Sequence, residues 1–320
     1  MAETLTGIHH VTAIASDPQR NVDFYVGVLG LRLVKQTVNF DDPGTYHFYY
    51  GDELGRPGTI LTFFPWPGAR RGRQGAGQIG ATAFSVPAGS LGFWTAHLSA
   101  AGVAVSGPDV RFDEDVIAFA DPDGLRLEIV GDEAAGMIPG WDGGPLPAEH
   151  AIRGVHSVSL WEADAALTGA ILRHTLGFAP VAEAGNRTRY HTAGSGVGTR
   201  VDVLHVPDAG PAAGGAGTVH HVAWRAADDA QQRAWRERVA AHGLRVTDVL
   251  DRQYFRSIYF REPGGVLFEI ATDPPGFTLD ETPDALGTSL KLPPWYEPQR
   301  ATIERVLPPI RVPAGKGAHG

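Results

Sequence analysis

The sequence predicts an α+β fold made of four related modules, each a strand, a helix and three further strands. Two observations predict it. Four stretches with similar first strands recur along the 320 residues, and two of them end in nearly matching hairpins. Self-similarity of this kind indicates supersecondary units that stack to bury a shared core. We expect the modules at residues 7–65, 79–131, 153–206 and 217–272.

The first strands supply the alignment of the modules. They read Gly7-Ile-His-His-Val-Thr, Ile79-Gly-Ala-Thr-Ala-Phe, Gly154-Val-His-Ser-Val-Ser and Thr218-Val-His-His-Val-Ala. A helix is expected after each strand, at residues 18–29, 89–101, 163–175 and 227–242. The last of these segments carries apolar residues at helical spacing, which is the pattern of a helix with one buried face.

Glycines mark the end of each expected helix, because glycine readily adopts the left-handed conformation just past a helix end. They are Gly30, Gly102, Gly177 and Gly243. Strand-like runs follow, and two modules close in similar hairpins. Pro-Asp-Gly precedes the strand with Glu128, and Pro-Gly-Gly precedes the strand with Glu269, each a tight-turn sequence.

These repeats divide the chain into consecutive units. We expect an N-terminal pair of modules at residues 1–131, a linker rich in glycine, proline and acids at 132–152, and a C-terminal pair at 153–272. A Pro-rich C-terminal arm at 273–320 lies outside the repeat, with a short helix near 298–306 and a frayed tail at 314–320.

Composition limits the function. The chain is 43% hydrophobic, and 27 basic residues face 36 acidic ones for a net charge of −9, which argues against nucleic acid or an anionic membrane as the main partner. The absence of cysteine excludes disulfides and thiolate metal sites. Neither a signal peptide pattern nor a long apolar run is present, so we expect a cytoplasmic protein.

Equivalent positions across the modules point to a site. The first strands offer His10, Ala83, Ser157 and His221, and the last strands offer Thr62, Glu128, Asp202 and Glu269. If modules one and four pair, His10, His221 and Glu269 meet. Two imidazoles and a carboxylate form the ligand set of non-haem iron(II) oxygenases, which keeps coordination positions open. Modules two and three would bring no such set together, so Glu128 and Asp202 are interpreted as structural.

These stretches resemble the glyoxalase/bleomycin-resistance/dioxygenase superfamily, whose fold is named for vicinal oxygen chelation. Within it the chain looks most similar to hydroquinone-type ring-cleaving dioxygenases, and the likeness extends through residues 45–59, 149–154 and 286–294. The resemblance implies that the βαβββ modules form two cupped, mixed-sheet half-barrels. The better-known catechol enzymes take a ligand from the third module, where this chain has Ser157.

The resemblance also implies the chemistry of the site. It assigns iron(II) to His10, His221 and Glu269, and it implies O2 and a small aromatic diphenol as substrates. Manganese(II) accepts the same ligands and stays open, as do the ring substituents and a homo-oligomeric state. Five further residues are expected in pocket or catalytic roles: His9, Thr12, His220, Arg252 and Tyr259.

Plainer roles compete for several of these residues. Strand alternation should turn His9 and His220 away from the pocket, where they would orient or pack against their neighbours. Tyr259 could fill the cup wall, and Arg252 could form a surface ion pair. Trp295-Tyr296 could cover the site mouth, although packing of the arm is favoured.

Two other functions remain alternatives. A metal-dependent lyase or isomerase of the glyoxalase kind would use a fourth ligand, often a carboxylate, where this chain has Thr62. A small-molecule-binding resistance protein would lack the His10, His221 and Glu269 set. Both features favour the dioxygenase.

Overall fold

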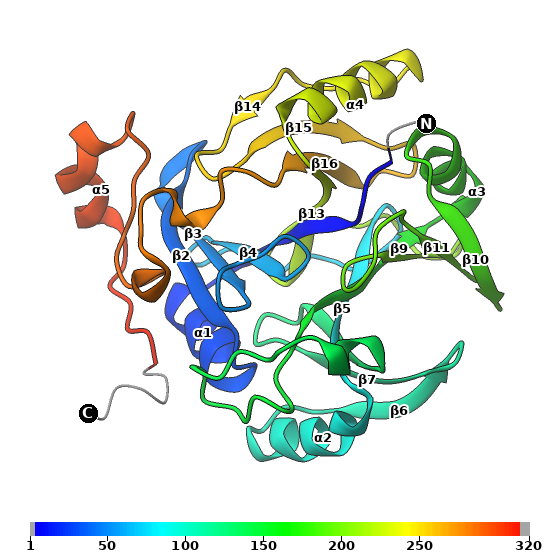
Figure 1. The fold of residues 1–320 in the computed structure, drawn as a ribbon, viewed down its shortest axis with the longest axis horizontal. Coiled ribbons are helices and arrows are strands. Elements are labelled where there is room, and N and C mark those ends of the chain that lie inside the picture. The colour runs from blue at the N-terminus through cyan, green and yellow to red at the C-terminus, as the bar shows by residue number, and fades with distance from the viewer. Residues whose placement is uncertain (1–3, 314–320) are drawn as a thin grey trace.

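The computed structural model describes residues 4–313, and residues 1–3 and the tail at 314–320, predicted to be frayed, lie outside this range. Two curled, mixed, eight-stranded sheets dominate the described residues and form half-barrels (Figure 1). This architecture confirms the predicted fold class. Each sheet combines the strands of two of the four related modules.

The first sheet joins modules one and four in the order β14-β15-β16-β13-β1-β4-β3-β2. Its strands are β1 (Ile8–Ala15), β2 (Arg32–Asn39), β3 (Asp42–Gly51), β4 (Ile60–Pro65), β13 (Thr218–Ala226), β14 (Leu250–Asp251), β15 (Arg256–Arg261) and β16 (Leu267–Thr272). Strands β1 and β13 are antiparallel at its centre, and each pairs in parallel with the last strand of its own module.

The second sheet joins modules two and three in the order β10-β11-β12-β9-β5-β8-β7-β6. Its strands are β5 (Gln78–Pro87), β6 (Ser106–Arg111), β7 (Glu114–Ala120), β8 (Arg126–Asp132), β9 (Gly154–Glu162), β10 (Ala179–Ala184), β11 (Arg187–His191) and β12 (Arg200–His205). The pairing of one with four and of two with three is the predicted one. Each sheet thus contains strands from residues 1–131 and from residues 153–272. The division of the chain into an N-terminal and a C-terminal pair of modules describes their order in the sequence and stays a prediction.

A helix follows the first strand of every module, as predicted. They are α1 (Pro18–Val22), α2 (Leu91–Ala100), α3 (Ala165–Ala170) and α4 (Asp229–Ala241), and α1 and α3 continue into π-helical turns at Asp23–Val28 and Ile171–Thr175. Aspartate side chains begin three of them: Asp17, Asp164 and Asp228 each accept a hydrogen bond from a backbone N–H of the first turn. Such caps satisfy donors that the helix itself leaves unpaired.

Alternation along the strands separates core from cup. In β13, Val222 and Trp224 are fully buried in the main apolar core, whereas His221 lies on the opposite face of the strand. In β16, Phe268 and Ile270 join the same core on either side of Glu269. Because successive side chains in a strand point to opposite faces, the packing of the core turns the polar residues toward the cup.

The C-terminal arm is bound to module one. Its short helix α5 (Arg300–Val306) lies beside β2 and β3 at the edge of the first sheet (Figure 1). Lys35 in β2 is fully buried and pairs with Asp280 and Glu281 of the arm. The predicted short helix near 298–306 is therefore present, and the arm packs against the sheet that carries the candidate site.

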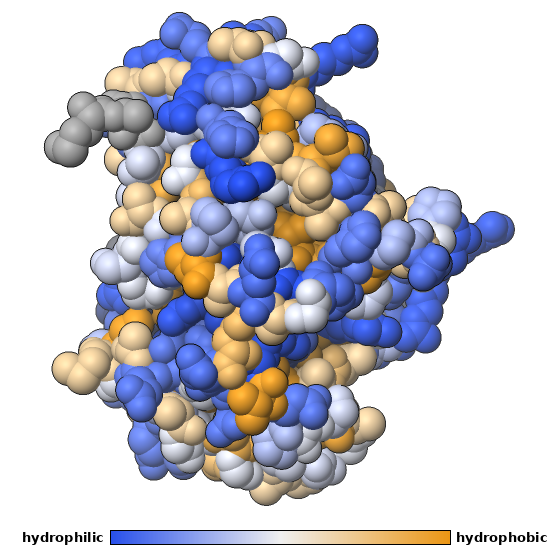
Figure 2. Space-filling view, turned by 90° about the vertical axis from the view of Figure 1, so that its right-hand side faces the viewer, coloured by the Kyte–Doolittle hydropathy of each residue, from blue (hydrophilic) through white to orange (hydrophobic). Residues whose placement is uncertain are grey.

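The outer surface shows no extended apolar patch on the side of α3 and β10. Figure 2 shows this face as mostly hydrophilic, with apolar residues in small scattered groups. Scattered apolar residues are normal on a protein surface. Among the described residues, no helix is long and apolar enough to cross a membrane.

Candidate metal centre

Three side chains meet inside the first cup. The Nε2 atoms of His10 and His221 lie 3.4 Å apart, and Oε2 of Glu269 lies 3.4 Å and 2.8 Å from them, respectively. The exposed fractions of the three residues are 2%, 5% and 0%. Within residues 4–313, these three are the side chains of metal-binding type that cluster, with one possible ligand atom from each lying within 4.8 Å of the others.

The strand register brings these groups together. His10 in β1 lies opposite Ala223 in β13, and Ala223 in turn lies beside Glu269 in β16. His221 lies opposite Thr12 on the adjacent pair. The small side chain of Ala223 leaves the space between the imidazole and the carboxylate open. Residues at opposite ends of the chain therefore converge because β1 and β13 are neighbours.

The charge states of Glu269 and His221 suit a bound cation. Burial alone would raise the pKa of Glu269, but the His10 and His221 imidazoles outweigh burial and hold that pKa well below its usual range. Burial lowers the pKa of His221, against the opposing effect of Glu269. The centre is thus an ionised carboxylate beside a neutral His221 imidazole at neutral pH.

An orphaned oxygen provides the test of fit. Oε1 of Glu269 accepts a short hydrogen bond from Ser257 Oγ, whereas the buried Oε2 has no partner with hydrogen-bond geometry. A buried, ionised oxygen without a partner is costly. Two ring nitrogens face the same point, so nitrogen and oxygen donors converge as a divalent transition metal requires. The residues present fit a bound metal ion.

The neighbouring histidines correct one expectation. Both His9 and His220 were expected to point away from the pocket; His9 does lie behind it, whereas His220 is among the residues that line it. Nδ1 of His9 lies 2.9 Å from Nδ1 of His10, and Nδ1 of His220 lies 2.8 Å from Nδ1 of His221. The register shifts by one residue at both positions, which is the mark of a β-bulge. A bulge breaks strict alternation and redirects the side chain.

These contacts can orient the two candidate ligand histidines, and a metal bound at Nε2 would fix their tautomers. A ligand that binds metal through Nε2 carries its proton on Nδ1, so His10 Nδ1–H donates to His9 Nδ1. His9 would then carry its own proton on Nε2, and the backbone of Thr272 acts to raise the pKa of His9 against the larger effect of burial. Burial, with the charge of His10, keeps the pKa of His9 well below its ordinary value. Burial and His221 likewise lower the pKa of His220 to about 4. Both outer histidines therefore stay neutral, and their contacts place them to orient His10 and His221.

Replacing His9 with phenylalanine should weaken metal binding by about 10- to 100-fold, because the tautomer and orientation of His10 lose their support. Competitive chelator titration measures the affinity directly. His156 occupies the equivalent bulge in the second sheet, so His156→Phe is the matched control and should leave metal affinity unchanged. Equal losses in both variants would contradict the orienting role of His9.

The centre opens into a cavity of about 320 Å³ with largely aromatic walls. His10, His221 and Glu269 form one end. The rest of the lining is Asn39, Phe40, Asp41, His47, Tyr49, Phe64, Trp66, His220, Arg252, Phe255, Tyr259 and Leu267. His9 and Thr12 are buried behind this surface. A cavity with aromatic walls beside the candidate metal centre suits a planar ring.

His47 and Tyr49 are cavity residues that the sequence interpretation missed. The Tyr49 hydroxyl lies 2.9 Å from His47 Nδ1, and His47 Nε2 lies 2.8 Å from Thr62 Oγ1, which donates to Thr12 Oγ1 at 2.9 Å. Burial, with the charges of His10 and His221, holds the pKa of His47 well below its ordinary value. The period-two pattern of β3 could have revealed both, because Tyr46, Phe48 and Tyr50 take the core face.

Arg252 and Tyr259 both line the cavity, as expected. Tyr259 lies opposite Glu269 in the ladder, and Nε of Arg252 donates to its hydroxyl at 3.3 Å. Burial and the charge of Glu269 raise the pKa of Tyr259, so its hydroxyl stays protonated. Arg252 also reaches Asp41, with NH2 to Oδ2 at 3.1 Å. Arg252 thus forms the ion pair that was its alternative role, and Tyr259 forms part of the cup wall, while both residues also line the pocket.

The arm residues Trp295 and Tyr296 do not line the cavity. Tyr296 donates its hydroxyl proton to the backbone oxygen of Phe40 at 2.8 Å, and the Trp295 ring packs edge-on against the Phe40 ring. The favoured interpretation, packing of the arm, agrees with these contacts. Through Phe40 the arm supports one side of the cavity mouth.

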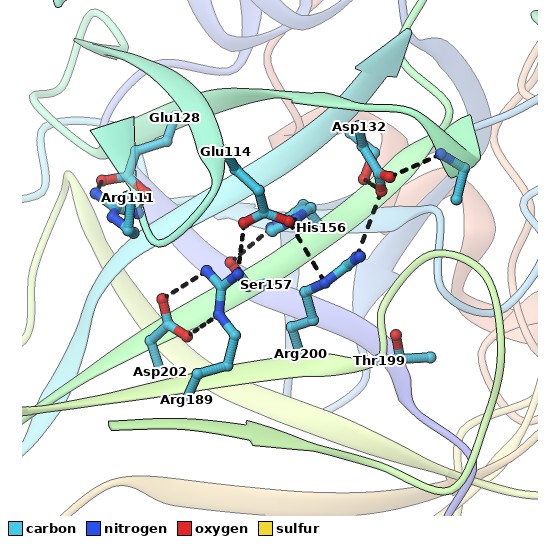
Figure 3. A network of polar contacts seen from close by, with 12 residues as sticks. Arg111, Glu114, Glu128, Asp132, His156, Ser157, Arg189, Thr199, Arg200 and Asp202 are labelled. Carbon is cyan, nitrogen blue, oxygen red and sulfur yellow. Dashed lines mark hydrogen bonds and ion pairs between the residues drawn. The ribbon is translucent and has the colours of Figure 1, made fainter. Parts of the chain in front are cut away.

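The second cup holds ion pairs in place of ligands. Its ladder sets Ala81 opposite Ser159, which lies beside Asp202, so Ala81 is equivalent to His10. The aligned position was expected at Ala83, so the sequence alignment of module two was wrong by two residues. Figure 3 shows Arg189 reaching Asp202 and Glu114, and Arg111 paired with Glu128. Arginine side chains thus neutralise Glu128 and Asp202, which agrees with the interpretation of these two acids as structural.

Comparisons with known proteins fit this architecture. The model of the Glyoxalase/Bleomycin resistance protein/Dioxygenase superfamily matches residues 7–129 and 154–270. The chain is 50% identical over 312 residues to "Putative ring-cleaving dioxygenase MhqO" of Bacillus subtilis, covering 98% of this chain and 99% of that one. It is 38% identical over 315 residues to a chlorohydroquinone/hydroquinone 1,2-dioxygenase of Sphingobium indicum, with 96% and 97% coverage. A crystal structure of a "putative dioxygenase" from Bacillus subtilis superposes with a TM-score of 0.93 at 49% identity, covering 98% of this chain and all of the other.

Proposed function

The chain belongs to the Glyoxalase/Bleomycin resistance protein/Dioxygenase superfamily, and we propose that it is a metal-dependent ring-cleaving dioxygenase that opens hydroquinone or a related diphenol with O2. One observation carries the proposal. The buried His10, His221 and Glu269 converge at the closed end of an aromatic cavity, and Glu269 Oε2 has no hydrogen-bond partner. The named activities of full-length relatives support it.

The three ligand residues would hold iron(II), with manganese(II) as the other metal of suitable ligand preference. When bound, such a metal supplies open coordination positions that bring a phenolate and O2 together and carry charge between them. The strand ladder holds the three ligands rigidly, and His9 and His220 fix the ligand tautomers. No fourth side chain joins the three within residues 4–313, and the hydroxyl of Thr62 is already bonded to His47 and Thr12.

The cavity walls then orient the ring. Phe64, Trp66 and Phe255 provide flat apolar surfaces on which a single ring packs, and they exclude water from the polar end. The Tyr259 hydroxyl keeps its proton and can donate to a substrate oxygen. The Arg252 guanidinium keeps its charge and favours the ionised form of a diphenol beside it.

Metal analysis and oxygen uptake on anaerobically purified protein test the function. We expect about one iron per chain and O2 consumption with hydroquinone well above that with catechol. Zinc retained tightly, no uptake with any diphenol and turnover of a glutathione hemithioacetal would instead identify a lyase. Binding of aromatic compounds with no metal and no turnover would identify a resistance-type binding protein.

A further inference from the structure

Two loops from distant modules meet at the mouth of the cavity. Arg252 lies in the turn between β14 and β15, and Asp41 lies in the turn between β2 and β3. The guanidinium meets the carboxylate with NH2 to Oδ2 at 3.1 Å and NH1 to Oδ1 at 3.4 Å. Both residues line the cavity, so their pairing decides which charge the mouth presents to a ligand.

The two partners differ in how far their side chains are exposed to solvent. The side chain of Arg252 is 17% exposed, whereas that of Asp41 is 74% exposed. An arginine cannot lose its charge by deprotonation. Within residues 4–313, Asp41 is the acid that makes an ion-pair contact with Arg252. The half-buried cation thus depends on a carboxylate at the solvent edge for its neutralisation.

The guanidinium also lies within reach of a ring bound at the metal end. Its central carbon is 5.5 Å from the centre of the Tyr259 ring, which lies 5.7 Å from the His221 ring. A substituent that points outward from a bound phenol would approach Arg252. A carboxylate there would compete with Asp41 for the same two N–H groups, which match carboxylate geometry.

The loop that carries Asp41 is held in place from behind. The neighbouring Phe40 accepts a hydrogen bond from Tyr296 at its backbone oxygen and packs against Trp295. Asp42 accepts from the indole N–H of Trp66, another wall residue. Because these contacts fix the turn, Asp41 is a standing counterion whose displacement by a ligand would break existing interactions.

We infer that Asp41 is a specificity-determining residue. By occupying the guanidinium of Arg252, it makes the cavity select diphenols without an acidic substituent and disfavour rings that carry a carboxylate. The inference rests on the proposed function, since it names the class of diphenol that the site accepts. It also predicts how a single substitution would change the preference.

Binding of matched neutral and anionic phenols to the metal-free protein tests the inference without turnover. We expect calorimetry of the wild type to show 4-hydroxybenzamide binding at least as tightly as 4-hydroxybenzoate. In Asp41→Asn the benzoate should gain about tenfold in affinity while the amide changes little, because a charge-assisted pair with Arg252 becomes available. The double variant Asp41→Asn, Arg252→Gln should lose that gain.

The matched control is Asp248→Asn. Asp248 is highly exposed, pairs with Arg236 and is not among the residues that line the cavity, so this change removes the same charge from outside the site. An equal gain in the control, or no change of preference in Asp41→Asn, would overturn the inference.

The loaded enzyme gives a separate readout. The ratio of kcat/KM for 2,5-dihydroxybenzoate over hydroquinone should rise in Asp41→Asn. If wild-type protein fails to consume O2 with hydroquinone while the binding pattern holds, the proposed function fails and the role of Asp41 stands. Normal turnover with an unchanged preference would refute only the role of Asp41.

Discussion

Alanine in place of His221 should remove the metal from the protein. The loss of one of three ligands leaves a site with two donors. Removing a residue that only hydrogen-bonds to a ligand already lowers metal affinity by about 10- to 100-fold, so we expect the loss of a ligand to lower it by at least about 100-fold. Metal content after desalting should fall to near zero, and O2 uptake with hydroquinone should fall with it. Elemental analysis and an oxygen electrode give the two measurements.

The matched control is His205→Ala, which removes an exposed imidazole at the end of β12. It should keep both metal and activity. Thermal unfolding in the presence of chelator separates ligand loss from misfolding, because wild type and variant should then unfold at similar temperatures. Unchanged metal content in His221→Ala would remove this residue from the centre.

Glutamine in place of Glu162 should stabilise the protein at alkaline pH. Glu162 ends β9, is fully buried, and neither of its carboxylate oxygens has a hydrogen bond. Burial, with the negative charge of Glu262, raises the pKa of Glu162 to about 8. The folded state therefore holds a proton that the unfolded state releases above about pH 4.3.

The sign of the pH dependence follows from this proton. The stabilising contribution is fully present below the unfolded pKa and is lost as pH rises toward the folded pKa of about 8. Between these values the free energy of unfolding should fall by about 1.4 kcal/mol per pH unit in the wild type. The Glu162→Gln variant lacks this slope, so at pH 8 it should be more stable by about 2–5 kcal/mol. Urea unfolding at pH 5, 6.5 and 8 provides the comparison.

Glu262 supplies a control of opposite sign. Its carboxylate accepts from Thr168 Oγ1, Gly264 N and Val266 N at 2.7–2.8 Å, so an amide there would face donors with an N–H group. Glu262→Gln should destabilise the protein by about 1–3 kcal/mol at every pH. Parallel pH profiles for wild type and Glu162→Gln would show that Glu162 is ionised when folded.

The repeat explains why the metal centre could be predicted from the sequence. His10 and His221 occupy the same position in the first strands of modules one and four, and Glu269 lies in the last strand of module four. Pairing of modules one and four was the arrangement that brought these three residues together. The exact pattern of strand alternation was less reliable, because bulges at His9 and His220 are not visible in the residue pattern. At the equivalent position in module two, an added Cβ on Gly80 would lie 2.2 Å from the Trp161 ring, so the bulge there needs glycine.

The cavity mouth could not be predicted in the same way. Asp41 belongs to a turn with no ligand-bearing counterpart in the other modules, and its contact with Arg252 depends on two loops more than 200 residues apart meeting in space. One ion pair of the second cup is also non-local, because Arg189 meets Glu114 only where β11 and β7 curve around the same hollow. Long-range pairing of polar side chains leaves no periodic signal.

The order of the strands has a consequence for synthesis on the ribosome. The second sheet uses a continuous stretch from Gln78 to His205, so it can assemble while later residues are still being added. The first sheet needs β1 to remain unpaired at its inner edge until β13 emerges. Since domains form as the chain appears, the cup with the candidate metal centre closes last, and the set of His10, His221 and Glu269 is complete only once Glu269 has been made.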